Sequence, residues 1–459
     1  MFKSINPATG ATVARFDGHT PTQVNNMLIR AVHAQDAWKR KPVAERVGLL
    51  TALATVLRRE KAQYAALITL EMGKPIVEAE AEIEKCAWTC DFYAAHAERF
   101  LSDEEVDTTA TLSKIVFDPL GLVLAVMPWN YPFWQFIRFA APAIAAGNGT
   151  VLKHASNVPQ CALAIESLFR AAGAPEGLCT VLLVPATSVN SLIEDVRIAA
   201  VTLTGSTEVG KLVAAQAGAQ MKKQVLELGG SDPFIVLADA DIDAAAQAAV
   251  TARFGNTGQS CISAKRFIVV DEVADRFVDA FGKLAAQLKV GAPEERGTQV
   301  GPMARANLRD TLHDQTERTL AAGARLVLGG HEVAGPGFYY APTILDHVTD
   351  QMAAGTEETF GPLAAVMRVR CVDDAIRLAN ATEFGLGAAL WTADMERAAE
   401  LARRIDAGAV FINGLVASDA RLPFGGIKQS GYGRELGVHG IREFVNIKTV
   451  WTGPRRQAA

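Results

Sequence analysis

From residue 120 onward, short apolar runs alternate with helical stretches, and this pattern constrains the fold more than any other feature of the chain. The apolar runs lie at 122–127, 150–152, 180–183, 200–204 and 225–228, and then at 234–237, 267–270, 325–328, 364–369, 387–391 and 409–412. Helical patterns at 158–172 and 207–217 separate runs of the first series. Such alternation is typical of mostly parallel sheets that helices cover on both faces. We therefore predict an α/β protein with two α/β domains in tandem.

The chain before this region has a different pattern. Thr20 is followed by Pro21 and, three residues after it, by Gln23, which predicts a capped helix start. Further helical patterns cover 43–72 and 76–100, whereas 108–117 and 443–451 are rich in β-forming residues and lie outside the alternation. The sequence therefore predicts a helical N-terminal region and two additional β segments.

Composition excludes several classes of protein. The 459 residues include 45 Lys and Arg against 50 Asp and Glu, a net charge of −5 that offers no basic field for nucleic acid. The uncharged run 119–137 contains prolines and polar residues that suit a strand and turn better than a membrane helix. The six cysteines form no CxxC pair, and the N-terminus has no apolar signal segment. We expect a cytoplasmic protein with no metal site and no membrane or nucleic-acid partner.

Two residues at predicted turns suit covalent chemistry. Cys261 ends the segment FGNTGQSC, whose small residues can leave a thiol accessible beside backbone N–H groups, although a buried inert cysteine is the commoner case. Glu227 ends an apolar strand before two glycines. Apolar surroundings raise the pKa of a carboxyl group and make it a usable base, but a glutamate facing water also fits this position.

Two further turns suit the binding of anionic groups. Asn130 lies between two prolines that stiffen its backbone, so its amide could donate to an oxyanion. Gly205 and Ser206 lie between a predicted strand and a predicted helix, where N–H groups can bind phosphate. The glycine spacing differs from the GxGxxG fingerprint, so an ordinary strand-to-helix turn fits equally well.

The order and spacing of these four turns resemble the aldehyde dehydrogenase superfamily. Further similar blocks extend the resemblance over essentially the whole chain: INPATG at 5–10, EMGKP at 71–75, EETFGP at 357–362 and PFGGIKQSG at 423–431. LKH at 152–154 and ASDAR at 417–421 look most like the short bacterial NAD(P)-dependent succinate semialdehyde dehydrogenases.

The resemblance implies a fold of three parts. These are a Rossmann-like cofactor-binding domain at 1–100 and 120–231, an α/β catalytic domain at 232–428, and a small β oligomerisation arm and tail at 101–119 and 429–459. Strands with open edges invite pairing with another subunit, so we expect a homodimer or homotetramer.

The resemblance also assigns site residues. Cys261 would be the nucleophile, Glu227 the general base, and Asn130 with the Cys261 N–H the oxyanion hole. The implied cofactor-binding residues are Trp129, Lys153, Ser156, Gly205, Ser206, Glu358 and Phe360. Among them, Lys153 would hold the adenosine ribose, Ser206 the pyrophosphate and Glu358 the nicotinamide ribose. Ser156 is neutral where relatives that prefer NAD often carry glutamate, so we expect NADP to be tolerated without excluding NAD.

The implied reaction is oxidation of an aldehyde, with succinate semialdehyde as the leading candidate. The presence of Glu227 favours hydrolysis of the thioester over transfer to coenzyme A. Arg138 lies eight residues after Asn130, as in succinate semialdehyde enzymes, and a guanidinium is suited to a distal carboxylate. Many such enzymes carry a second arginine at the position of Gly255. We therefore expect Ser418 and Arg421 to complete the substrate site.

Two alternatives remain open at this point. The chain could be a broad-specificity dehydrogenase of aliphatic or hydroxy-aldehydes, which a panel of acidic and neutral aldehydes would reveal. It could also be a non-catalytic structural or binding member of the superfamily, although the catalytic residues named above argue against that role.

Overall fold

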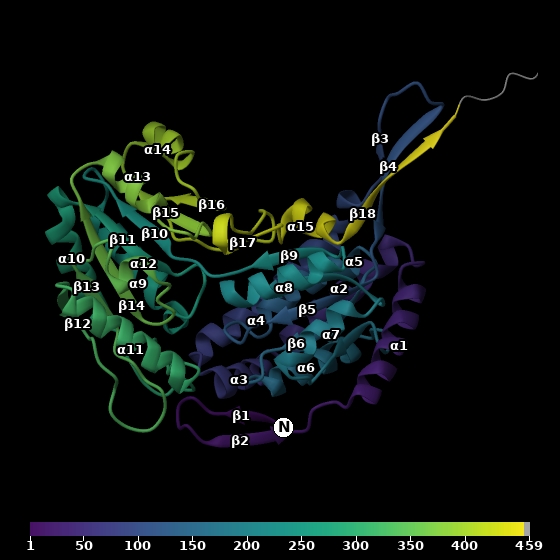
Figure 1. Cartoon of the computed structure of the whole chain (residues 1–459), viewed down its shortest axis with the longest axis horizontal. Helices are drawn as coiled ribbons and strands as arrows, with labels where there is room; N and C mark the ends of the chain where they lie inside the picture. The colour runs from purple at the N-terminus through teal and green to yellow at the C-terminus, as the bar shows by residue number, and fades with distance from the viewer. Residues whose placement is uncertain (454–459) are drawn as a thin grey trace, which may run out of the picture.

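The computed structural model describes residues 1–453 and contains two large sheets, one in each half of the molecule (Figure 1). The first sheet has the order β17 (Gly431–Tyr432), β9 (Lys223–Glu227), β8 (Ile198–Thr204), β5 (Leu122–Met127), β6 (Gly149–His154) and β7 (Cys179–Val181). All its pairings are parallel except that of β17 with β9. The predicted α/β class is confirmed.

Helices cover both faces of the first sheet. In β5, Leu122, Leu124 and Val126 pack in one apolar cluster, and the intervening Val123 and Ala125 pack in another. One cluster includes residues of α1 (Pro21–Trp38), α7 (Val189–Glu194) and α8 (Thr207–Ala219). The other includes residues of α2 (Val43–Arg59), α3 (Lys61–Met72), α4 (Ile76–Phe100), α5 (Trp134–Ala145) and α6 (Pro159–Ala171). A strand buried on both faces explains why its sequence is continuously apolar.

The predicted N-terminal helices are present with one difference. Thr20 and Gln23 form the capping box at the start of α1. The single helical pattern at 43–72 is instead two helices, α2 and α3, because the chain leaves regular helical geometry at Glu60. Before them, β1 (Phe2–Ile5) and β2 (Thr12–Phe16) form a hairpin that the sequence analysis did not predict.

The second sheet has seven strands. Its order is β12 (Arg325–Leu328), β13 (Thr343–Asp346), β14 (Leu363–Val369), β11 (Ala264–Val270), β10 (Asp232–Val236), β15 (Gly387–Trp391) and β16 (Ala409–Ile412), with only β12 antiparallel. One face packs against α9 (Ile242–Phe254) and α10 (Asp271–Ala285). The other packs against α11 (Ala306–Ala321), α12 (Ala353–Thr356), α13 (Val372–Asn380) and α14 (Met395–Ala402). The sequence analysis did not predict the four-residue strand β13.

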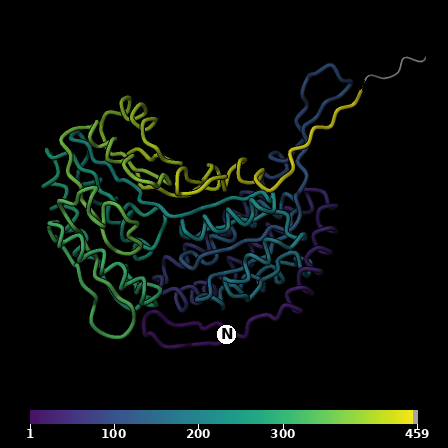
Figure 2. The backbone as a smooth tube through the Cα atoms, viewed as in Figure 1, coloured from purple at the N-terminus to yellow at the C-terminus, as the bar shows by residue number. Residues whose placement is uncertain are grey.

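A three-stranded arm projects from the first half of the molecule (Figures 1 and 2). It consists of β18 (Val445–Thr452), β4 (Leu112–Pro119) and β3 (Glu104–Glu105), with β18 and β4 paired over eight residues. The two β-rich segments predicted from the sequence form these longer strands. The segment 429–459, which we assigned to the arm and tail, is divided: β17 joins the first sheet and α15 (Gly437–Glu443) packs against α4 and α5. Its last six positions lie outside the described residues.

Within residues 1–453, no helix is both long enough and apolar enough to cross a membrane.

Candidate active site

Two cavities meet at Cys261, between the two halves of the molecule. The larger has a volume of about 300 Å³ and the smaller about 220 Å³. Cys261 and Gln135 are the residues that line both. A thiol at this junction can contact two different ligands at the same time, one from each side.

The turn before Cys261 has an unusual backbone. Asn256 and Thr257 have φ angles of 54° and 55°, and Gly258 follows with a φ of 70°, so three successive residues are in the left-handed region. A side chain on Gly258 would clash with the carbonyl oxygen of Gly361. The small residues that precede the cysteine in the sequence are therefore a requirement of this turn, and the strain is retained where the thiol must be positioned.

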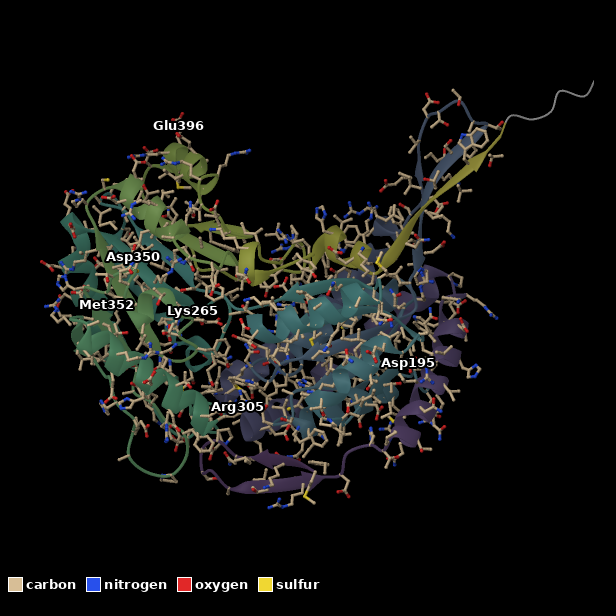
Figure 3. All side chains as sticks on the ribbon, in the orientation of Figure 1. Asp195, Lys265, Arg305, Asp350, Met352 and Glu396 are labelled. Atoms are coloured by element: carbon tan, nitrogen blue, oxygen red, sulfur yellow. The ribbon has the colours of Figure 1, made fainter. Side chains whose placement is uncertain are left out.

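Two buried cations hold the backbone around the thiol. Arg253 donates from Nη2 to the carbonyl oxygen of Gly258 and from Nη1 to that of Ala264, each at 2.9 Å. Lys265 Nζ donates to the Cys261 carbonyl oxygen at 2.7 Å. Figure 3 labels Lys265 near the junction of the two halves. The main chain on both sides of the sulfur is therefore fixed before any ligand binds.

The electrostatic environment keeps the thiol protonated in the free protein. Burial raises the pKa of Cys261 to about 12, against the opposing effect of the positive charges of Arg138 and Lys265. The charge of Glu227 adds to the increase in this pKa. Because the thiolate is the nucleophilic form, formation of a reactive Cys261 needs an added positive charge or a proton acceptor.

Asn130 is attached to the same turn. It follows β5, its side chain is buried, and its Nδ2 donates to the Gln259 carbonyl oxygen at 3.1 Å. Its own carbonyl oxygen accepts from Asn256 Nδ2 at 3.1 Å. Asn130 and Cys261 both line the smaller cavity. An amide fixed in this way is a suitable donor to an oxygen that becomes negatively charged beside the sulfur.

Glu227 lies at the end of β9 in a fully desolvated position. Neither of its carboxyl oxygens has a hydrogen-bond partner within the described chain, and burial, assisted by the charge of Glu435, raises its pKa to about 8. The residues that line the two cavities do not include Glu227. A Cβ added at Gly425 would come within 2.8 Å of its Oε1, so the carboxyl lies under the loop that contains Gly425. To act near Cys261, the side chain has to turn or work through a water molecule.

The smaller cavity brings together five of the seven predicted cofactor-binding residues. These are Trp129, Gly205, Ser206, Glu358 and Phe360. The rings of Trp129 and Phe360 meet edge to face with centroids 5.8 Å apart. Lys153 is the penultimate residue of β6, and Ser156 follows three residues later, both at the carboxyl edge of the same sheet but outside the lining of this cavity. Arg305, which the sequence analysis missed, also lines it and lies over the Trp129 ring at 5.7 Å.

The floor of the smaller cavity offers both an acceptor and donors. Glu358 accepts from the Gly230 N–H at 3.0 Å and lies 3.5 Å from Lys265 Nζ. A Cβ on Gly229 would lie only 2.7 Å from Glu358 Oε2, so this glycine is needed for the approach of the carboxylate. Ser206 is the N-cap of α8 but makes no side-chain cap bond, which leaves N–H groups of a 13-residue helix open. Such a helix end binds phosphate.

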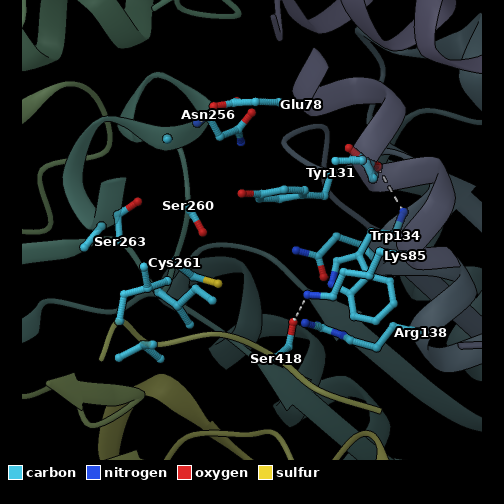
Figure 4. Close-up of a pocket in the computed structure, with 18 of the residues that line it drawn as sticks. Glu78, Lys85, Tyr131, Trp134, Arg138, Asn256, Ser260, Cys261, Ser263 and Ser418 are labelled. Carbon is cyan, nitrogen blue, oxygen red and sulfur yellow. Dashed lines mark hydrogen bonds between the residues drawn. The ribbon is translucent and has the colours of Figure 1, made fainter. Parts of the chain in front are cut away.

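The larger cavity is lined by predicted and unpredicted residues. Arg138, from α5, is only 2% exposed, forms an ion pair with Glu435, and lies over the Phe424 ring at 4.6 Å. Ser418 accepts a hydrogen bond at 2.7 Å from Lys85, a residue that the sequence analysis missed (Figure 4). In the sequence, Lys85 was recognisable only as a charged residue beside the buried face of the helix that we predicted at 76–100. Gly255 also lines this cavity and contributes no cation.

Arg421 does not reach the larger cavity. Its side chain is 68% exposed and forms an ion pair with Asp419 at 2.6 Å. It lines a separate surface hollow together with Trp88, over whose ring it lies at 5.7 Å. The prediction that Arg421 complements Arg138 therefore lacks support from the geometry, because the short-range pair with Asp419 turns the guanidinium outward.

Known proteins resemble the chain over its whole length. Residues 1–450 match the model of the aldehyde dehydrogenase family. A probable NADP(+) succinate-semialdehyde dehydrogenase of Synechocystis is 52% identical over 448 residues, which cover 98% of this chain and 99% of the relative. The NAD(P)+ succinate semialdehyde dehydrogenase of Escherichia coli is 48% identical over 448 residues, covering 98% and 97%.

Solved structures agree with these relatives. The succinic semialdehyde dehydrogenase of Streptococcus pyogenes, solved in complex with NADP+, has a TM-score of 0.97 and 37% identity, and the match covers 99% of this chain and 100% of that one. The predicted fold and the predicted resemblance are confirmed. The family model, the relatives and the solved structures all match this chain over nearly its whole length. The chain therefore belongs to the aldehyde dehydrogenase family.

Proposed function

We propose that this protein oxidises succinate semialdehyde to succinate with NADP or NAD. One observation carries the proposal: Cys261 separates a cavity that contains Lys85 and Arg138 from one that contains Ser206 and Glu358. The first has the cations that an aldehyde with a distal carboxylate needs. The names of the relatives from Synechocystis, Escherichia coli and Streptococcus pyogenes agree with this substrate.

The residues of the smaller cavity fit a nicotinamide dinucleotide. The uncapped start of α8, with Gly205 and Ser206, suits the pyrophosphate, and the fixed carboxylate of Glu358 suits a ribose hydroxyl. Lys153 and Ser156 at the neighbouring strand end are available for the adenosine ribose. Ser156 places no carboxylate there, which supports tolerance of a 2′-phosphate, as do the NADP(+) and NAD(P)+ relatives.

In the first half of the reaction, the Cys261 sulfur attacks the aldehyde carbon. The carbonyl oxygen becomes an oxyanion, and Asn130 Nδ2 donates to it together with the Cys261 N–H. One such donor contributes about 3 kcal/mol to the transition state. When bound in the smaller cavity, the cofactor would supply a hydride acceptor and a positive charge. Loss of hydride from the carbon leaves a thioester on Cys261, which divides the oxidation into two easier steps.

In the second half, Glu227 accepts a proton from the water that attacks the thioester. Its raised pKa matches a base that works near neutral pH. The products are the free Cys261 thiol and the carboxylic acid. Burial favours the neutral form of Glu227, which limits the negative charge near Cys261 while the thiolate forms.

A second candidate is broad activity on neutral aliphatic aldehydes. The aromatic rings of Tyr131 and Trp134 and the apolar Ile262 and Val416 also line the larger cavity, and they would accept an alkyl chain. Kinetics on succinate semialdehyde, butanal and 4-hydroxybutanal with each cofactor test the two candidates. A kcat/KM for succinate semialdehyde that is no higher than for butanal would exclude the proposed substrate.

We also propose a domain division, an assembly and a location. Residues 1–100 and 120–231 would bind the cofactor, 232–428 would carry Cys261, and 101–119 with β18 would form the oligomerisation arm. Ile447, Val450 and Trp451 are exposed apolar residues on β18, which supports a homodimer or homotetramer. All six cysteines are free thiols, which supports a cytoplasmic location. Light scattering of the purified protein measures the assembly.

A further inference from the structure

Lys85 extends from α4 into the larger cavity as a cation without a carboxylate partner. Its Nζ donates to Ser418 Oγ at 2.7 Å and lies 4.5 Å from the centroid of the Trp134 ring. Among residues 1–453, no carboxylate oxygen lies within 4.0 Å of this ammonium group. An ammonium group has three donors, so two remain for a ligand.

Arg138, the other cation of this cavity, is already balanced. It forms a buried ion pair with Glu435, and both side chains are no more than 3% exposed. Arg138 Nη2 has no acceptor in the described part of the chain, so it can still donate to a ligand. The positive charge that the protein leaves unbalanced in the larger cavity is therefore that of Lys85.

The surroundings of Lys85 favour an added anion. Burial and the charge of Arg138 lower its pKa to about 8, and Cys86, Asp419 and Glu82 only partly oppose them. Asp419 is paired with Arg421, and Glu82 is paired with Lys74. A carboxylate bound beside Lys85 would stabilise the ammonium form and replace the missing counter-charge.

We infer that Lys85 binds the distal carboxylate of the aldehyde substrate and determines the preference for acidic aldehydes. The inference rests on the function proposed above. Figure 4 shows Lys85, Arg138 and Ser418 together, facing the Cys261 sulfur across the cavity. Because the Ser418 oxygen accepts from Lys85, its own hydroxyl hydrogen remains available to the carboxylate. A short acidic aldehyde held there has its other end directed toward Cys261.

The test replaces Lys85 by methionine, which keeps an unbranched side chain only one atom shorter and removes the charge. Loss of a hydrogen-bonded charge contact should raise KM for succinate semialdehyde about 10- to 100-fold, with kcat little changed. KM for butanal, which has no carboxylate, should stay the same. Lys283→Met serves as the matched control, because Lys283 is an exposed lysine of α10. An equal change for both aldehydes would show that Lys85 only supports the structure, and would overturn the inference.

Two further measurements keep the test decisive. Succinate should inhibit butanal oxidation by the native enzyme, and Lys85→Met or Lys85→Gln should weaken this inhibition by a similar factor. Lys85→Arg should restore most of the preference for the acidic aldehyde. Unchanged inhibition by succinate in the charge-free variants would refute the role of Lys85. If the native enzyme does not prefer succinate semialdehyde, the proposed function fails, whereas a native preference that survives Lys85→Met refutes only this inference.

Discussion

Glu227→Gln separates the two halves of the proposed reaction. The change keeps the size of a side chain that is buried at the end of β9 and removes its ability to accept a proton. Because the charge of Glu227 raises the pKa of Cys261, its removal does not hinder formation of the thiolate. We expect the variant to form the thioester and release one burst of reduced cofactor. Hydrolysis should then be slower by about 100- to 10,000-fold, the usual contribution of a general base.

The pH dependence of steady-state turnover provides a second test of this prediction. A carboxyl group acts as a base only in its ionised form, and the pKa of Glu227 is about 8. Only about a tenth of Glu227 is therefore ionised at pH 7. Steady-state turnover limited by hydrolysis should rise with pH, with a midpoint near the pKa of about 8, and level off about one pH unit higher. Glu227→Gln should lose this rise. Glu435→Gln is the matched comparison, since it removes a charge that raises this pKa and should move the rise to lower pH.

The assay is rapid mixing of enzyme, cofactor and aldehyde, followed by the absorbance of the reduced nicotinamide through the burst and the steady state. Thermal melting of each variant checks that it is folded, because Glu435→Gln leaves Arg138 without its ion-pair partner. An unchanged steady-state rate in Glu227→Gln would refute the assignment of the base. Loss of the burst would instead place Glu227 in the attack of the thiol.

Three further outcomes follow from the site. Asn130→Ala should lower kcat/KM by about 100- to 1,000-fold because it removes an oxyanion donor; a loss below tenfold in steady-state kinetics would contradict that role. Gly258→Ala should inactivate the enzyme and lower its melting temperature, since the added carbon meets Gly361 in a left-handed turn; alkylation of Cys261 by iodoacetamide would report the displaced thiol. The ratio of kcat/KM for succinate semialdehyde to that for butanal should fall above about pH 8 as Lys85 loses its proton, while the effect of Glu227 cancels in this ratio. A ratio that is constant up to pH 10 would contradict a charged Lys85 in the site.

The local pattern of apolar and polar residues was sufficient to predict most helices and strands of the fold. The alternation of apolar runs identified the five parallel strands of the first sheet and six of the seven strands of the second. Thr20 and Gln23 indicated the start of α1 because a helix cap is formed by residues three positions apart. The hairpin β1–β2 and the strand β13 were missed, since β1 and β2 precede the alternating region and no apolar run was recognised at β13.

The proposed catalytic residues were predicted by similar means, because each lies in a short block whose order and spacing resemble a known family. Asn130 donates a hydrogen bond to the Gln259 carbonyl oxygen in the turn before Cys261, and both residues line the smaller cavity. The same blocks indicated Trp129, Ser206 and Glu358, which line one cavity. Sequence blocks were therefore sufficient to predict the class of protein, the thiol and the residues that lie near it.

The charges that line the larger cavity could not be predicted from the sequence. Arg138 is paired with Glu435, almost 300 positions later in the chain, and Lys85 meets Ser418 across a separation of 333. Arg421, only three residues after Ser418, points outward to Asp419. Periodicity and caps reflect contacts between near neighbours in the chain, whereas the charge balance of a cavity depends on how distant elements pack. For that reason the sequence predicted the thiol and its neighbours, whereas the packing of α4, α5 and the 415–435 region leaves Lys85 without a carboxylate partner in the larger cavity.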